Sequence, residues 1–318
     1  MFSSLSKLTG DIDRLSDGRI YGKVRAIQGM LVEIGGVQAF LSVGDRCTLI
    51  GRRDERVACE VVGFRDDRAL AMPFGALDGI GLGSAVEVGE SNLVAYPSEA
   101  WLGRVINAFG EPLDGKGLID RGDVDYPVKR AAPPAHARGR VDGKIDLGVK
   151  SLNAFVTCCR GQRMGVFSAS GVGKSILMSM LARYSQADVI VIGLVGERGR
   201  EVKEFVEEDL GAEGLARSVL VVATSDESPL MRRQAAYMTM TVAEYFRDQG
   251  RDVLCLMDSV TRFAMAQREI GLSAGEPPTS KGYPPTTFSE LAKLLERAGP
   301  GVEQGSITGL FSVLVEGD

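Results

Sequence analysis

The stretch that decides the fold is Ser168-Ala169-Ser170-Gly171-Val172-Gly173-Lys174-Ser175. An apolar run, Met164 to Phe167, precedes it, and a segment of helical character, Ile176 to Leu181, follows it. Strand, glycine loop and helix in this order are the setting in which a loop ending in Gly-Lys-Ser binds phosphate. The glycines let backbone N–H groups turn toward a phosphate chain, and the helix N-terminus adds its positive end.

The last residues of this loop have predicted roles in binding Mg-ATP. Lys174 is expected to reach the β- and γ-phosphates, and the Ser175 hydroxyl is placed to bind Mg²⁺. The strict pattern has glycine at position 168, where this chain has serine. The alternative is a glycine-rich turn with an exposed lysine. The predicted nucleotide-binding residues are Ser170, Gly171, Val172, Gly173, Lys174, Ser175 and Ile176.

Two carboxylates follow apolar strands further along the chain. Asp258 ends the run Val253 to Met257, where a carboxylate of a parallel sheet lies beside the phosphate loop and can hold Mg²⁺ through water. Glu197 follows the strand expected at 189–195, and hydrolysis needs such a group to orient or deprotonate water. The alternatives are a turn or helix cap for Asp258 and a solvated helix start for Glu197.

Residues 151–318 alternate strand-like and helix-like segments. The apolar runs are 164–167, 189–195, 219–222 and 253–257, and amphipathic stretches include 201–210 and 230–249. This alternation is typical of βαβ units, so we expect an α/β fold with a mostly parallel sheet that is covered on both faces.

The first part of the chain has a different pattern of apolar residues. Residues 18 to about 90 contain short Val/Ile/Leu alternations broken by glycine, which predict a small β-barrel or sandwich. Residues 91 to about 150 are rich in turns and proline, and we expect connecting structure on the surface of the next domain. The predicted domains are therefore a barrel over 1–92 and a nucleotide-binding domain over 93–318.

Composition excludes several other classes of protein. The 318 residues carry a net charge of -5, which argues against a nucleic-acid-binding protein. The five cysteines lack a CxxC spacing and His136 is the only histidine, so a disulfide framework or a zinc site is not expected. No apolar run reaches the ~18 residues that span a bilayer, and the chain does not start like a signal peptide.

Taken together, these motifs resemble the catalytic subunits of rotary ATP synthases and their type III protein-export relatives. The resemblance runs from about residue 20 to the end. The motifs that carry it, most of them close to the flagellar export branch, are 103–107, 110–115, 160–175, 195–202, 241–248, 256–269 and 282–285. In that branch the first glycine of the phosphate loop is commonly replaced, as it is by Ser168 here.

The resemblance implies an architecture and a role for each site residue. It implies a RecA-like P-loop core preceded by the barrel, and a Mg-dependent ATPase. Glu197 matches the carboxylate that polarises water, and Arg198, in the same motif, helps position the γ-phosphate side. Asp258 matches the acid linked to magnesium through water, and Arg262 matches an arginine near the nucleotide and the subunit interface. With Lys174, these residues form the expected catalytic set.

The resemblance further implies a cellular setting. The family's members form hexameric rings that energise flagellar type III protein export, in the cytoplasm and peripherally at the inner membrane. The expected partners are a regulator, stalk and gate proteins of the export apparatus, and export substrates with their chaperones. No nucleic acid is expected.

One departure from the family pattern concerns the end of the sequence at Asp318. Family members continue into a segment with an arginine finger and then a mostly helical domain, so we expect a truncated form that lacks both. Because an arginine finger contributes ~10³–10⁵ in rate, we expect this chain to bind nucleotide but hydrolyse it slowly.

Alternative functions remain open from the sequence. A virulence-type secretion ATPase of the injectisome shares the same fold and chemistry. A RecA-like RNA translocase is a second alternative, although residues 18–90 lack an evident basic and aromatic groove. A non-catalytic ring subunit and a purely structural paralogue are further ones; Glu197 argues against the former.

Overall fold

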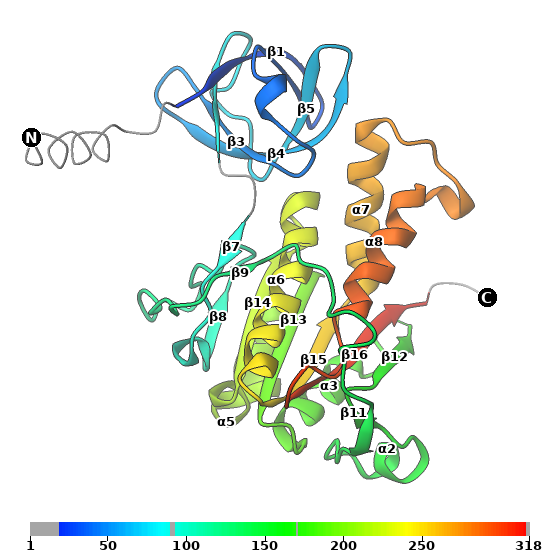
Figure 1. The fold of residues 1–318 in the computed structure, drawn as a ribbon. Coiled ribbons are helices and arrows are strands. Elements are labelled where there is room, and N and C mark those ends of the chain that lie inside the picture. Colours follow the sequence, from blue (N-terminus) through cyan, green and yellow to red (C-terminus); the bar gives the residue numbers. More distant parts are fainter. Residues whose placement is uncertain (1–18, 90–92, 170, 316–318) are drawn as a thin grey trace, which may run out of the picture. The chain divides into compact units, whose positions relative to one another are not determined.

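The computed structural model describes residues 19–89, 93–169 and 171–315. The chain divides into two compact units, Met1–Ser91 and Asn92–Asp318. The first unit is built of strands, and the second is an α/β unit whose helices flank a sheet (Figure 1).

The first unit is a closed barrel with the strand order β1-β2-β5-β4-β3-β6. Its strands are β1 Tyr21–Gln28, β2 Leu31–Gly35, β3 Arg46–Ile50, β4 Arg56–Arg65, β5 Arg68–Pro73 and β6 Ala85–Val88. Alternate side chains such as Val24, Ile34 and Leu49 fill the interior and are almost fully buried. The predicted barrel is confirmed, and the alternative sandwich is not what forms.

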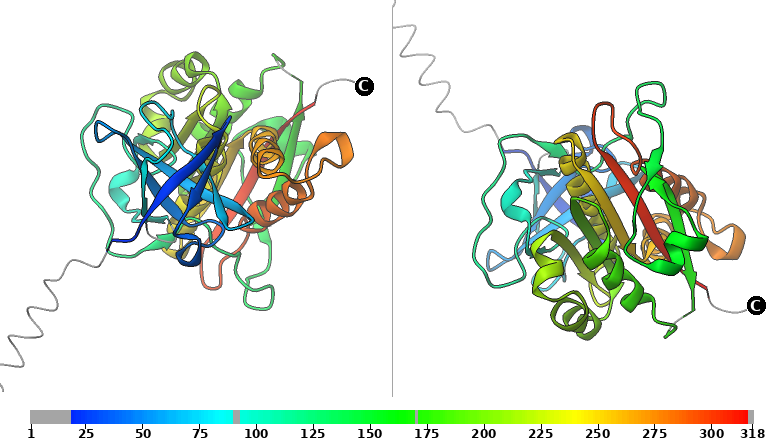
Figure 2. Two further views of the ribbon diagram at one scale, coloured as in Figure 1. Left: turned by 90° about the horizontal axis from the view of Figure 1, so that it is seen from above. Right: turned by 90° about the horizontal axis from the view of Figure 1, so that it is seen from below.

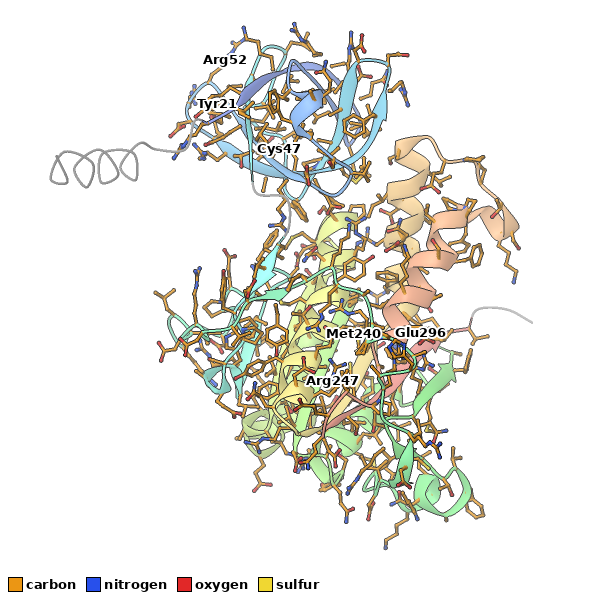
Figure 3. All side chains as sticks on the ribbon, in the orientation of Figure 1. Tyr21, Cys47, Arg52, Met240, Arg247 and Glu296 are labelled. Carbon is orange, nitrogen blue, oxygen red and sulfur yellow. The ribbon has the colours of Figure 1, made fainter. Side chains whose placement is uncertain are left out.

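Two features of the barrel follow directly from its sequence. Gly29 adopts a φ of 57°, which the short turn between β1 and β2 requires and which glycine adopts without strain. Cys47 and Cys59 face each other across β3 and β4 as buried free thiols. Cys47 lies within the barrel, whereas Tyr21 and Arg52 are on its outside (Figure 3).

The second unit contains a sheet with the order β12-β16-β15-β13-β14-β8, in which every neighbouring pair is parallel. Its strands are β8 Arg104–Ile106, β12 Arg163–Ser168, β13 Val189–Glu197, β14 Ser218–Thr224, β15 Asp252–Asp258 and β16 Ser306–Leu314. Two-stranded pairs join β7 Val94–Ala95 to β9 Tyr126–Pro127 and β10 Asp142–Lys144 to β11 Cys159–Arg160. The predicted mostly parallel sheet is confirmed.

Helices cover both faces of this sheet, as Figures 1 and 2 show. The helices are α2 Lys150–Phe155, α3 Lys174–Tyr184, α4 Gly199–Glu204, the π-helix η3 Phe205–Leu210, α5 Gly211–Ala216, α6 Pro229–Asp248, α7 Val260–Ala274 and α8 Pro285–Glu296; short 3-10 turns lie at Gln38–Phe40, Glu99–Trp101 and Ser280–Gly282. One core joins the sheet to α6, α7 and α8, and the other joins its opposite face to α3 and the segment through η3. Both faces are apolar, which explains why the strands read as continuous hydrophobic runs.

The segment 91–150 differs from the expectation in one respect. Most of it is irregular, but β8 is a strand of the sheet and pairs with β14. Arg104 makes a two-pronged ion pair with Asp114, at 2.7 and 2.8 Å, which folds the following turn back onto β8. Treating the whole segment as surface connection was therefore wrong for these residues, because a strand of three residues is too short to show a period.

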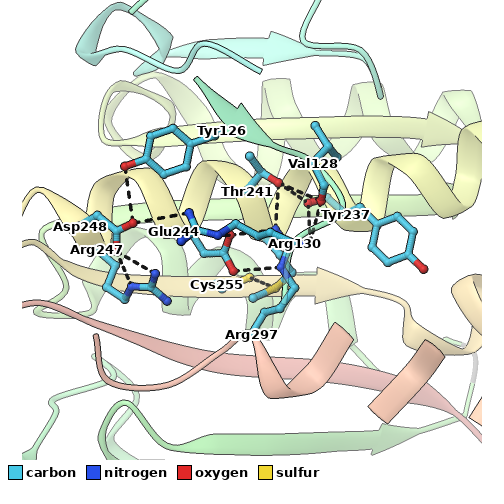
Figure 4. Close-up of polar contacts among 11 residues, drawn as sticks. Tyr126, Val128, Arg130, Tyr237, Thr241, Glu244, Arg247, Asp248, Cys255 and Arg297 are labelled. Atoms are coloured by element: carbon cyan, nitrogen blue, oxygen red, sulfur yellow. Dashed lines mark hydrogen bonds and ion pairs between the residues drawn. The ribbon is translucent and has the colours of Figure 1, made fainter. Parts of the chain in front are cut away.

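A buried ion-pair network ties the end of α8 to the middle of α6 (Figure 4). Arg297 donates to both carboxylate oxygens of Glu244, at 2.9 and 2.8 Å, and the two side chains are 3% and 0% exposed. The same guanidinium donates to the Val128 carbonyl and to the Thr241 hydroxyl, each at 2.9 Å. These bonds satisfy charges that would otherwise be costly to bury.

Across the described ranges, no helix combines the length and the apolar character needed to cross a membrane.

Candidate functional site

The phosphate loop connects β12 to α3 at the carboxyl end of the sheet. Gly171 and Gly173 have φ values of 78° and 91°, a region that glycine adopts without strain. Gly173, the N-cap of α3, has no side chain that could cap the helix, and N–H groups at such a helix start can bind an anion. Ser170, a predicted binding residue, lies outside the described residues.

A cavity of about 630 Å³ opens at this helix end. Its volume lies within the ~300–1,000 Å³ range of small-molecule sites. Of the residues predicted from sequence, the following line it: Gly171, Gly173, Lys174, Ser175, Ile176, Glu197, Arg198 and Arg262. Val172 does not line it and is largely exposed. The structure thus brings predicted residues from three separate segments to one cavity.

Lys174 and two carboxylates form a charged cluster, in which Lys174 and Glu197 line the cavity and Asp258 does not. The Lys174 Nζ lies 2.6 Å from Asp258 Oδ1 and 3.8 Å from Glu197 Oε1. The three side chains are 12%, 4% and 18% exposed, so their charges interact through a medium less polar than water. Lys174 forms ion pairs with both carboxylates, and an incoming phosphate chain would compete with them for Lys174.

Each carboxylate stands at the end of a neighbouring strand. Glu197 is the last residue of β13 and Asp258 the last of β15, and these strands pair in parallel. Their carboxyl ends therefore meet at one edge of the sheet, beside the loop that follows β12. This topology explains why Glu197 and Asp258 lie close together although they are 61 positions apart in the sequence.

Burial and, to a smaller extent, the neighbouring Asp258 charge raise the pKa of Glu197 to about 7, against the lowering effect of Lys174. A carboxyl group with a pKa near neutrality can exchange a proton with water at physiological pH. Glu197 therefore has the properties of a general base, and its position on the cavity wall gives a bound nucleotide access to it.

The two predicted arginines differ in their surroundings. The Arg198 side chain is 78% exposed and pairs with Glu201 at 2.8 Å, so in this state it points along the surface. Arg262 lines the cavity, and its buried Nε has no hydrogen-bond partner among the described atoms. Gly196 lets α7 approach closely, since a Cβ there would lie 2.9 Å from the Cβ of Arg262.

The donor set suits magnesium bound mainly by nucleotide and water. Ser175 lines the cavity, whereas Asp258 is buried and is connected to the cavity through its ion pair with Lys174. Lys174 and Ser312 both hydrogen-bond to Asp258 Oδ1. Within the described residues, no group of three or more His, Cys, Asp or Glu could hold a metal ion.

Sequence reasoning missed several residues of this site. Ser225 and Glu201 line the cavity, and Ser312 donates a 2.7 Å hydrogen bond to Asp258. Glu201 lay within a motif that was recognised but carried no assigned role. Ser312 had no signal at all, because a serine within the apolar run Leu310 to Val315 reads as a tolerated core residue.

Comparison with protein families agrees with both units. A model of the ATP synthase alpha/beta family, nucleotide-binding domain, matches residues 148–318. A model of the beta-barrel domain of the same family matches residues 24–88. The matches cover the cavity and the barrel described above.

Individual relatives are similar over most of the chain. The flagellum-specific ATP synthase of Caulobacter vibrioides is 57% identical over 99% of this chain and 72% of its own length. The corresponding protein of Bacillus subtilis is 49% identical over 94% of this chain and 68% of its own. The type 3 secretion system ATPase of Xanthomonas euvesicatoria is 50% identical over 98% of this chain and 70% of its own.

A solved structure has the same fold. It is the assembled ATPase EscN in complex with its central stalk EscO, from the type III secretion system of enteropathogenic E. coli. It superposes with a TM-score of 0.84 at 38% identity, over 92% of this chain and 71% of that one.

Proposed function

The chain belongs to the ATP synthase alpha/beta family, and from this premise we propose that it is the ATP-hydrolysing subunit of a flagellar type III protein-export apparatus. The observation that carries the catalytic part is the cluster of Lys174, Asp258 and Glu197 at the mouth of a phosphate loop. The similarity to flagellum-specific ATP synthases supports the biological part.

The residues of the cavity suggest how hydrolysis would proceed. Lys174 would exchange its carboxylate partners for the β- and γ-phosphates, assisted by the N–H groups at the start of α3. Release of Lys174 leaves the Glu197 carboxylate to accept a proton from a water molecule, whose oxygen attacks the γ-phosphorus while the bond to the ADP oxygen breaks. Arg262, which lines the cavity, would stabilise charge on the phosphate side.

Magnesium is part of this proposal. Held by Ser175 and, through water, by Asp258, the ion would neutralise charge on the phosphate oxygens. The remaining nucleotide contacts are proposed for Ser170 to Ile176. Arg198 would act after a change of partner, because its present partner is Glu201.

The proposal extends to assembly and place. The similar solved structure is an assembled ATPase with a central stalk. We propose that this chain likewise forms a ring, a homo-hexamer, which meets stalk, regulator and gate proteins at the cytoplasmic face of the inner membrane. Export substrates and their chaperones would be its further partners.

One experiment tests the function in the cell. The Glu197 codon is changed to Gln in the source organism, and flagellin is measured in the culture medium by immunoblot. We expect exported flagellin and motility to be lost while the variant protein accumulates at the wild-type level. Normal flagellin export would overturn the proposal.

The second candidate is a virulence-type secretion ATPase, which the similarity to the Xanthomonas protein and to EscN favours. The same strain separates the two. Loss of effector secretion with intact motility would establish the second candidate in place of the first.

A further inference from the structure

A serine on β16 contacts the carboxylate on which magnesium binding is proposed to depend. Ser312 lies on β16, next to β15 in the sheet, and its Oγ donates to Asp258 Oδ1 at 2.7 Å. The two residues are 2% and 3% exposed. We propose that Ser312 is a positioning residue that holds Asp258 in the orientation needed for nucleotide-bound magnesium, an inference that rests on the proposed function.

The position of Ser312 within its strand argues for a specific role. Side chains two apart on a strand share a face, so Ser312 shares its face with Leu310 and Leu314. Leu310 is buried in the core that includes α3. A hydroxyl placed among such residues costs free energy unless it is hydrogen-bonded, and the carboxylate of Asp258 is the acceptor that the structure provides.

The same oxygen of Asp258 also accepts from Lys174, at 2.6 Å. Lys174 is the group expected to leave when phosphates enter the cavity. Ser312 would then be the remaining donor on Oδ1, so the carboxylate keeps its orientation at the moment at which the metal arrives. Because both bonds fall on Oδ1, we expect the other oxygen, Oδ2, to accept from a metal-bound water.

The end of β16 is itself fixed to the elements around the site. The Leu314 N–H donates to Thr261 Oγ1 at 2.9 Å, in the helix that begins after Asp258. The Val315 N–H donates to the Ser168 carbonyl at 3.0 Å, at the start of the phosphate loop. These bonds fix the strand just beyond Ser312 to the helix that follows Asp258 and to the residue that begins the phosphate loop.

The chain offers a matched control in the same two strands. Ser306 Oγ donates to Asp252 Oδ1 at 2.9 Å, and both pairs are separated by 54 positions. Ser306 is also buried, at 7% exposure. It lies six residues before Ser312, about 20 Å away along the strand, so it shares the chemistry of the pair but not the cavity.

The test measures binding of a fluorescent ATP analogue with Mg²⁺ and with EDTA, for wild type, Ser312→Ala and Ser306→Ala. Removing an outer partner of a metal-linked group costs about tenfold or more in metal affinity. We expect Ser312→Ala to lose about tenfold of the gain in affinity that Mg²⁺ brings, with the Kd in EDTA unchanged. Ser306→Ala should match wild type in both conditions.

A double-mutant cycle adds an independent readout. If Ser312 acts through Asp258, Ser312→Ala should change Mg-dependent affinity by less than about twofold when Asp258→Asn is already present. Thermal unfolding without nucleotide checks that each variant folds.

Specific outcomes would overturn the inference. One such outcome is that Mg²⁺ raises the affinity of Ser312→Ala for the ATP analogue as much as it does for wild type. Another is that Ser306→Ala loses as much Mg-dependent affinity as Ser312→Ala, which would indicate a general effect on the strand pair. A wild-type chain that binds no ATP analogue in either condition would overturn the proposed function, and this inference with it.

Discussion

At the scale of single residues, the site is a balance of one cation and two carboxylates. Lys174 lies 2.6 Å from Asp258 and 3.8 Å from Glu197, and the charge of Asp258 raises the cost of ionising Glu197. Glu197 bears this cost, since burial and the Asp258 charge raise its pKa to about 7. The group proposed as the base is therefore half-protonated near neutral pH.

The pKa of Glu197 predicts the pH dependence of catalysis. A base acts only when deprotonated, so kcat/KM for Mg-ATP should fall about tenfold per pH unit below pH 7 and level off above it. The measurement is kcat/KM between about pH 5.5 and 8.5, since this constant reports ionisation in the free enzyme. A flat profile across this window would contradict the assignment of Glu197.

At the scale of elements, the sheet holds the site together and the buried pair of Arg297 and Glu244 holds α6 to the end of α8. Removing one member of such a pair leaves the other charge buried without its partner, whereas replacing both with apolar residues removes the problem. The network in Figure 4 therefore leads us to expect a larger loss of stability from removing one partner than from replacing both.

We expect Glu244→Ala to lower the free energy of unfolding by about 3 kcal/mol, because it leaves the Arg297 guanidinium uncompensated. The double variant Glu244→Leu with Arg297→Met should recover most of this loss. Urea denaturation followed by circular dichroism measures both. Additive losses in the double variant would show that the two side chains stabilise the fold independently of each other.

The elements also show what a sequence can reveal. A glycine loop, the ends of strands and long apolar runs each have a local signature in the sequence, so the phosphate loop, Glu197 and Asp258 could be predicted from it. Strand β8 could not, because its three residues depend on pairing with β14 rather than on a period of their own. Ser312 could not either, because its role comes from a neighbour 54 positions away.

At the scale of the whole molecule, the residues that line the nucleotide cavity all belong to the second unit, Asn92–Asp318. The barrel contributes a closed core of its own, around residues such as Val32 and Ala71. A ligand directly stabilises only the folded state that binds it. At a ligand concentration of 100 Kd, this stabilisation is about 2.7 kcal/mol.

Hydrogen exchange should reveal this division. Saturating Mg-ATP is expected to slow amide exchange in the loop and first turn, residues 171–177, by about tenfold or more, and to leave β2 and β5 unchanged. Mass spectrometry of peptides from wild type and Lys174→Ala provides the comparison. Protection that persists in Lys174→Ala would place the nucleotide elsewhere.

The most direct measurement of the central claim is single-turnover ATP hydrolysis with protein in excess, by wild type and Glu197→Gln, together with ATP binding by both. We predict that Glu197→Gln binds Mg-ATP within about threefold of wild type but hydrolyses it at least about 100-fold more slowly, since the loss of a general base costs ~10²–10⁴ in rate. Hydrolysis by Glu197→Gln at the wild-type rate would contradict the account and require a different base.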